Sequence, residues 1–191
     1  MEYAYRWSRI PCASRQRKTT VSLCIRRATR ADPAAIAKVH VASWQQAYRH
    51  FLPADYLASL SIEQRRLQWV DAITAGINGI FVAELGGELI GFSCIGPCRD
   101  EGATNATYEI LAIYVNPANW TQGVGRELWL ASLGFAQESR AERVSLWVFT
   151  ENARAISFYQ AAGFVCEEES LTTFEIGGIN ASELRYVLKL N

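Results

Sequence analysis

The chain has 191 residues, half of them hydrophobic, and its formal net charge is zero. This length and composition suit one globular domain with a sizeable core, and no apolar run is long enough to cross a membrane. The five cysteines are irregularly spaced, and although Cys94 and Cys98 could form half of a metal site, no second ligand pair matches them. We therefore expect free thiols in a reducing cytoplasm, and no bound metal.

Basic residues are concentrated at the start of the chain. Residues 1–20 contain five arginine or lysine side chains against one glutamate, whereas the remainder is more acidic than basic. The basic segment could be a nucleic-acid-binding arm, a transit-like leader or a mobile tail. We expect residues 1–21 to be a mobile basic extension and 22–191 to be the domain, with neither nucleic acid nor membrane as partner.

In the first half of the chain, residues typical of helix ends and of a hairpin turn mark where helices and strands begin and end. Asp32 and Pro33 predict an N-cap followed by proline at the first helical position. Gly76 and Gly79 end a second helix, and Gly86-Gly87 separates two alternating apolar segments, as in a β-hairpin. The expected elements are a strand over 23–29, a helix from 33 to about 48, a helix from about 61 to 73, and strands over 80–85 and 88–96.

The second half alternates strands and helices and ends in a hairpin around Gly177-Gly178. Residues 106–115 are nearly apolar on both faces, which is typical of a central strand. The expected elements are a strand over 106–115, a helix beginning near 124, a strand over 144–149, a helix over 152–163, and strands over 164–175 and 180–190. We expect one α/β (α+β) domain with a mixed, mostly antiparallel sheet of about seven strands and about four helices. Its strand–helix–strand unit over 106–149 should be parallel.

The segment NPANWTQGVGREL, residues 116–128, predicts an anion-binding turn. Gly123 and Gly125 lie at the start of a helix, where the first backbone N–H groups have no partner inside the helix. Glycine lets this backbone approach a phosphate closely, and Arg126, unfavourable at the positive end of a helix dipole, could pair with that phosphate. The segment is not a P-loop, because no Gly-Lys-Ser/Thr follows, and Leu128 stands where a dinucleotide fingerprint would have its third glycine.

Two segments resemble motifs of a known family. EILAIYVNP (109–117) followed by QGVGREL (122–128) is similar to the acetyl-CoA motif of the GNAT superfamily of N-acetyltransferases, and NARAISFYQAAGF (152–164) resembles the family's next motif. The resemblance covers about residues 22–190. The chain departs from the family at Trp120, where members usually have Gln or Arg. The resemblance implies a GNAT-like domain whose central strands splay apart at an acetyl-CoA site.

The resemblance implies acetyl-CoA as co-substrate and indicates how it is held. The amides of 122–126 would cradle the pyrophosphate, and the backbone of Ile113 and Val115 would pair with the pantetheine arm. The N–H of Ile113 would donate to the thioester carbonyl, and Asn152 could both cap its helix and bind the arm. The expected cofactor-binding residues are Ile113, Tyr114, Val115, Gln122, Gly123, Val124, Gly125, Arg126, Asn152 and Tyr159.

Glu109 and Tyr159 are the candidate catalytic residues. An attacking alkylammonium has a pKa of about 10 and must lose a proton. Glu109 lies about 13 Å along the strand from Ile113, so it would act through a water molecule; a structural glutamate paired with a nearby cation is the alternative. Tyr159 follows Asn152 by two helical turns, and the family commonly has tyrosine there to protonate the departing thiolate; packing against the sheet is the alternative.

Three side chains on the first helix, His40, Trp44 and Tyr48, form a stripe at i, i+4 and i+8. The resemblance implies that this helix walls the acceptor cleft, where aromatic rings could hold a cationic amine; core packing is the alternative for each. We expect transfer of an acetyl group to a primary amine, on a small molecule or a protein, by direct attack in a ternary complex. A catalytically silent CoA-binding regulatory module is the alternative, and a homodimer stays open.

Overall fold

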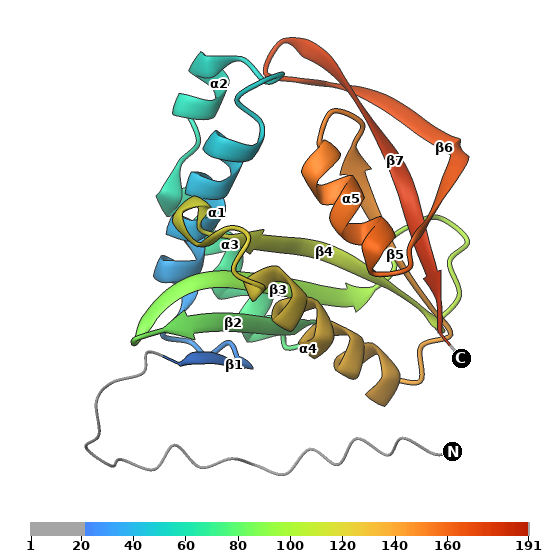
Figure 1. The fold of residues 1–191 in the computed structure, drawn as a ribbon, viewed down its shortest axis with the longest axis horizontal. Coiled ribbons are helices and arrows are strands. Elements are labelled where there is room, and N and C mark those ends of the chain that lie inside the picture. The colour runs from blue at the N-terminus through green and yellow to red at the C-terminus, as the bar shows by residue number, and fades with distance from the viewer. Residues whose placement is uncertain (1–21, 191) are drawn as a thin grey trace.

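The computed structural model describes residues 22–190, so the basic extension expected over 1–21 lies outside the described residues. The helices and strands of this region follow one another along the chain as in Figure 1. They are β1 (Leu23–Arg27), α1 (Pro33–Ala47), α2 (Ala54–Ala58), α3 (Ile62–Ala75), β2 (Gly79–Leu85), β3 (Glu88–Pro97), β4 (Thr107–Val115), the 3-10 helix η1 (Pro117–Asn119), α4 (Val124–Glu138), β5 (Arg143–Phe149), α5 (Ala153–Ala161), β6 (Val165–Ile176) and β7 (Ile179–Lys189).

All seven strands belong to one mixed sheet in the order β1-β2-β3-β4-β5-β7-β6. β4 and β5 are parallel, and the other five neighbouring pairs are antiparallel. α4 makes the crossover between β4 and β5, as a parallel pair requires. This architecture confirms the expected fold class.

β4 and β5 pair over only part of their length. Their register runs from Thr107 opposite Arg143 to Ile110 opposite Leu146, although β4 continues to Val115 and β5 to Phe149. Beyond this point β4 crosses the view in Figure 1 while β5 turns upward with β6 and β7. The strands therefore diverge at the carboxyl end of β4.

The divergence leaves backbone groups of β4 free of strand partners. The Asn116 N–H donates to Ile90 O at 2.7 Å, which makes these opposite residues a hydrogen-bonded pair. Hydrogen-bonded and non-hydrogen-bonded pairs alternate along an antiparallel ladder. The N–H and C=O groups of Ile113 and Val115 therefore point away from β3, toward the gap that β5 leaves.

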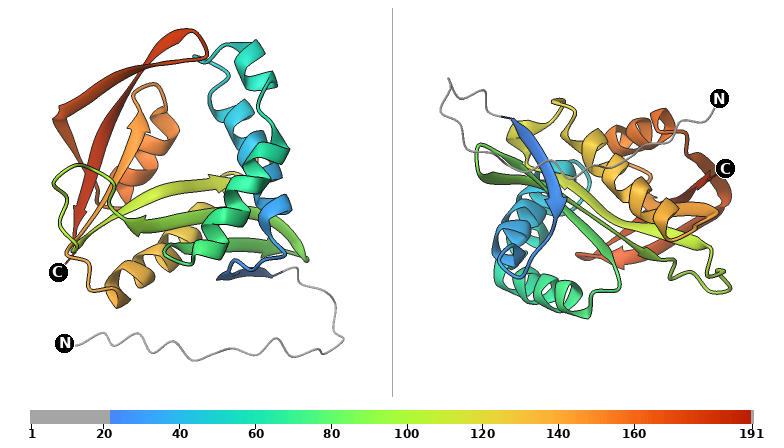
Figure 2. Two further views of the ribbon diagram at one scale, coloured as in Figure 1. Left: turned by 180° about the vertical axis from the view of Figure 1, so that it is seen from behind. Right: turned by 90° about the horizontal axis from the view of Figure 1, so that it is seen from below.

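Helices cover both faces of the sheet, as the views in Figures 1 and 2 show. α1 and α3 pack on one face, where Ile36 and Trp69 join a cluster with Val82 and Phe92 of the strands. α4 and α5 lie on the other face, and Leu128 of α4 is fully buried against β2 and β3. No helix within residues 22–190 combines the length and apolarity that a membrane span needs.

Two local expectations differ from the structure, and one short helix was not expected. Asp32 precedes α1, but its side chain caps no helix N–H; it accepts instead from the Thr29 backbone and the Arg26 guanidinium, whose two bonds are 2.8 Å long. Gly76, with φ of 67°, ends α3, whereas Gly79 is the first residue of β2. The one-turn helix α2 has no amphipathic repeat long enough to predict it.

Candidate active site

A cavity of about 410 Å³ lies where β4 diverges from β5. It is walled by the end of β4, the turn that follows, the start of α4 and one side of α5. Its lining includes Val115, Gly123, Gly125, Arg126, Arg154 and Phe158. The turn predicted from the sequence to bind an anion therefore forms one end of this cavity.

The N-terminus of α4 presents backbone N–H groups to the cavity. The Glu127 N–H makes the first bond of the helix, to Gly123 O at 3.2 Å, so the preceding N–H groups have no partner inside it. Gly123 has φ of 80°, which favours glycine, and a Cβ there would have no atom within 4 Å. A Cβ at Gly125 would approach nothing closer than the Phe158 ring, 3.8 Å away. Open space beside unpaired amides fits a phosphate group.

Two polar side chains near this turn, Arg126 and Gln122, make only weak interactions within the protein. The Arg126 guanidinium donates to the Glu127 carboxylate at 2.9 Å, and both side chains are exposed. Exposed pairs contribute little stability, so a phosphate could replace Glu127 as the partner of Arg126. The Gln122 amide donates to Ala118 O at 3.4 Å, and its side chain is not part of the cavity lining.

Trp120, which replaces the Gln or Arg usual in the family, connects the turn to the end of β4 through a hydrogen bond. Its indole Nε1 donates to Val115 O at 2.8 Å, and the Ser43 hydroxyl donates to the same oxygen at 3.0 Å. The Arg154 guanidinium lies 4.1 Å from the centre of the Trp120 ring. The Val115 carbonyl thus has both acceptor positions filled. Of the two backbone groups of Val115, only the N–H can therefore bond to a ligand. The roles of Trp120 and Arg154 were not foreseen from the sequence.

A second cavity, of about 290 Å³, adjoins the first on the side of β5, β6 and β7. It is lined by β4 from Glu109 to Tyr114, and its lining also includes Trp44 of α1, Trp147 of β5 and Phe174 of β6. Six residues line both cavities: Tyr48, Ile113, Tyr114, Asn152, Ala155 and Tyr159. The two cavities therefore meet at the divergence of β4 and β5.

Tyr159 lies at this junction on α5. Its ring packs between Phe158 and Phe164, with centroid distances of 5.3 and 5.7 Å. Burial raises the pKa of Tyr159 above its ordinary value, so the hydroxyl keeps its proton at neutral pH. Asn152 caps the helix as expected, with Oδ1 accepting from the Ala155 N–H at 3.2 Å. This bond leaves the Asn152 amide nitrogen free to donate toward either cavity.

Glu109 is buried in the second cavity, with 2% of its side chain exposed. Its Oε1 accepts from Arg99 Nη2 at 2.6 Å, and its Oε2 accepts from Arg99 Nε at 3.0 Å and the Arg99 N–H at 3.1 Å. The cation pairing considered from the sequence is therefore present, between a buried carboxylate and an arginine side chain that is 70% exposed. One lone pair on Oε1 remains to accept a further hydrogen bond.

The three aromatic side chains of the α1 stripe have different surroundings. Trp44 and Tyr48 line the second cavity, and the Tyr48 hydroxyl lies 3.1 Å from the Tyr114 hydroxyl. His40 is part of neither cavity lining; its Nδ1 accepts from Trp69 Nε1 at 3.3 Å. Burial, with a smaller effect of nearby Arg65, lowers the pKa of His40 to about 3. The sequence pattern alone did not separate the two cavity residues from the core residue.

Comparisons with known proteins agree with this geometry. A family model described as "Acetyltransferase (GNAT) family" matches residues 41–164. The uncharacterized N-acetyltransferase YuaI of Bacillus subtilis is 34% identical over 161 residues, which cover 84% of this chain and 89% of the relative. The chain belongs to the GNAT family and is an N-acetyltransferase.

Solved structures share the fold at lower identity. The PaiA N-acetyltransferase from Thermoplasma acidophilum, solved in complex with coenzyme A, superposes with a TM-score of 0.73 at 20% identity, covering 88% of this chain and 99% of that one. The acetyltransferase YncA from Salmonella typhimurium, solved with acetyl-CoA, gives a TM-score of 0.67 at 21% identity, covering 88% and 94%. The cytoplasmic location, the expected absence of a metal and the homodimer stay predictions.

Proposed function

We propose that this enzyme transfers the acetyl group of acetyl-CoA to a primary amine by direct attack in a ternary complex. The proposal rests on one observation: the two cavities share Tyr159 and Ile113 in their linings, at the place where β4 and β5 diverge. One cavity has phosphate-binding features, and the other has aromatic and acidic walls. A thioester and an amine held in them would meet at the junction, which removes the entropic cost of bringing them together.

Residues of the first cavity would hold acetyl-CoA. The unpaired amides at the start of α4 face the place for the pyrophosphate, and Arg126 and Arg154 add positive charge at the rim. The pantetheine arm carries amides that can pair with the Ile113 C=O and the Val115 N–H in the gap beside β4, which leaves the Ile113 N–H for the thioester. When bound, acetyl-CoA supplies an activated acyl group.

Residues at the junction would perform the transfer. The Ile113 N–H stabilises the negative charge that develops on the carbonyl oxygen. The amine nitrogen forms its bond to the carbonyl carbon as the carbon–sulfur bond breaks, and the Tyr159 hydroxyl gives its proton to the sulfur. Glu109 accepts one ammonium proton through a water on its remaining Oε1 lone pair, which makes the amine neutral for attack. The second proton leaves the nitrogen of the tetrahedral adduct through water and reprotonates Tyr159, and Glu109 then returns its proton to solvent.

The experiment that tests this function is thiol release from acetyl-CoA with a panel of primary amines, with the acetylated product identified by mass spectrometry. Calorimetric titration of CoA provides the binding control. The proposal predicts CoA binding together with amine-dependent release of thiol. Tight CoA binding without acetylation of any amine, peptide amines included, would favour a regulatory CoA-binding module.

A further inference from the structure

The second cavity contains one carboxylate without a counter-ion. Its lining has three charged side chains, Arg99, Glu109 and Glu183 of β7. Arg99 and Glu109 form a bidentate ion pair. Glu183 is partly buried and forms no ion pair within 4 Å with any group in residues 22–190. The charged groups that line this cavity therefore sum to one negative charge.

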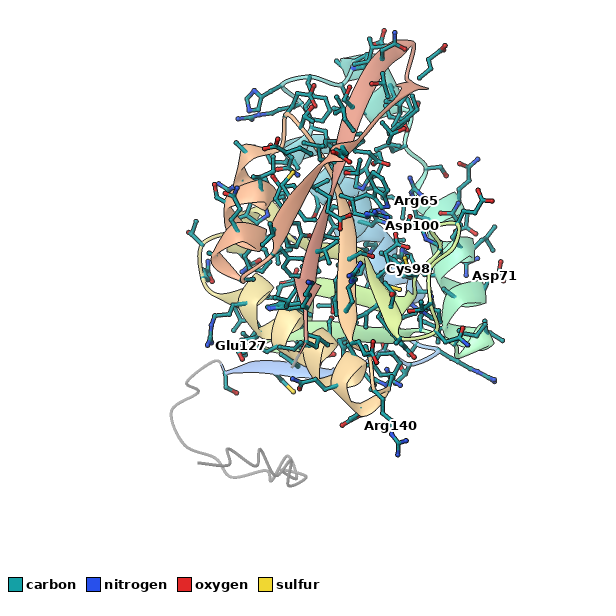
Figure 3. The ribbon with its side chains drawn as sticks, turned by 90° about the vertical axis from the view of Figure 1, so that its right-hand side faces the viewer. Arg65, Asp71, Cys98, Asp100, Glu127 and Arg140 are labelled. Atoms are coloured by element: carbon teal, nitrogen blue, oxygen red, sulfur yellow. The ribbon has the colours of Figure 1, made fainter. Side chains whose placement is uncertain are left out.

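The arginine nearest to Glu183 in sequence is already paired. Arg185 donates to Asp100, labelled in Figure 3 in the loop between β3 and β4, at 2.9 Å, and to Glu167 at 2.6 Å. Burial raises the pKa of Glu183; nearby Arg99 opposes this shift, whereas the neighbouring carboxylates Glu109 and Asp100 add to it. A positively charged ligand group would relieve this surplus of negative potential.

Aromatic side chains line the same cavity as this carboxylate. Glu183 is opposite Phe149 in the β5–β7 register, so both side chains belong to the same face of the sheet. Trp147, Trp44 and Phe174 complete the aromatic wall. Ring faces attract a cation and accommodate a flat apolar group. A volume of about 290 Å³ lies near the lower end of the range for ligand pockets, about 300–1,000 Å³, so the acceptor should be small.

We propose that Glu183 binds the ammonium group of the acceptor, and that the acceptor is a small primary amine with a single positive charge and a flat, apolar body. The proposal rests on the proposed function, because the bound amine must reach a thioester at Tyr159. An added carboxylate on the acceptor would lie in a cavity that already has surplus negative charge. An additional ammonium group would find no second free carboxylate in the cavity lining, because Glu109 is already paired with Arg99.

Steady-state kinetics with phenethylamine, phenylalanine and spermidine test the proposal. Glu183→Gln should raise the KM for phenethylamine at least about tenfold, the effect of one hydrogen bond between charged groups, with kcat within about threefold. Glu175→Gln is the matched control, because Glu175 is exposed on the same hairpin and lines neither cavity; it should change nothing. The wild-type enzyme should have its highest kcat/KM with phenethylamine.

A binding measurement separates this proposal from the proposed function. Calorimetric titration of phenethylamine into the CoA-saturated enzyme should show binding that Glu183→Gln weakens at least about tenfold. Such binding without turnover would support the role of Glu183 and contradict the proposed function. An unchanged KM and Kd in Glu183→Gln would overturn the role of Glu183 while leaving the transferase intact. Preference for phenylalanine, spermidine or a lysine peptide over phenethylamine would overturn the substrate class.

Discussion

Replacing Tyr159 by phenylalanine separates the chemistry of the junction from its packing. The ring contacts with Phe158 and Phe164 are kept in the variant. The hydroxyl has no hydrogen-bond partner within residues 22–190, so its removal breaks no bond in the protein. The free energy of unfolding should change by less than about 1 kcal/mol, which corresponds to a Tm shift of at most about 4 °C for a domain of this size.

The rate should change far more than the stability. A positioned general acid contributes about 10²–10⁴-fold, equivalent to about 3–5 kcal/mol of activation free energy. We therefore expect kcat for thiol release from acetyl-CoA to fall at least about 100-fold in Tyr159→Phe, with the calorimetric Kd for CoA unchanged. Tyr108→Phe makes the same chemical change on β4, outside both cavities, and should keep full activity. A kcat within threefold of wild type for Tyr159→Phe would refute the role of Tyr159 as the acid.

Further predictions concern the base, the packing and the pH response. Glu109→Gln should lower kcat about 100-fold with the acceptor KM retained, and an unchanged kcat would exclude Glu109 as the base. In urea denaturation, Gly134→Ala should stabilise the protein by about 0.5–1 kcal/mol, because the added Cβ on α4 meets no atom within 4 Å; a loss would contradict this. Gly79→Ala should destabilise it by about 1–3 kcal/mol, because the Cβ would lie 2.6 Å from an aromatic ring of α4, and no loss would show that this ring can move. Arg26 holds the pKa of Asp32 at about 2, below its ordinary 3.8, so the associated stability is present above about pH 4 and is lost as the pH falls toward 2. Denaturation curves of Asp32→Asn should lack this part of the pH dependence, and an unchanged dependence would contradict the assignment.

The parts of the site that were predictable from the sequence are local in the chain. Gly123 and Gly125 flank the first residue of a helix, and the strand that ends at Val115 directly precedes this turn, so a short segment contains the whole phosphate-binding signal. Asn152 caps a short helix that contains Tyr159, and their spacing places both near the junction. Such features depend on helix and strand periodicity, which a single sequence carries.

The parts that were not predictable depend on contacts between distant segments. Arg99 lies in the loop between β3 and β4 and pairs with Glu109 of β4, and no sequence period links the two. Glu183 enters the second cavity because β7 pairs with β5 in one register, and a shift of one residue would turn it to the other face. His40 has the same spacing as the cavity residues of its stripe, but Trp69 of α3 packs over it and bonds to it.

Two-substrate steady-state kinetics test the central claim most directly, namely that the acetyl group passes straight from one cavity to the other. Initial rates of thiol release are measured while acetyl-CoA and phenethylamine are varied together. Direct attack in a ternary complex predicts intersecting lines in double-reciprocal plots and no acetylated enzyme by mass spectrometry. Parallel lines together with an acetylated enzyme would contradict the account, because they would place a covalent intermediate between the two cavities.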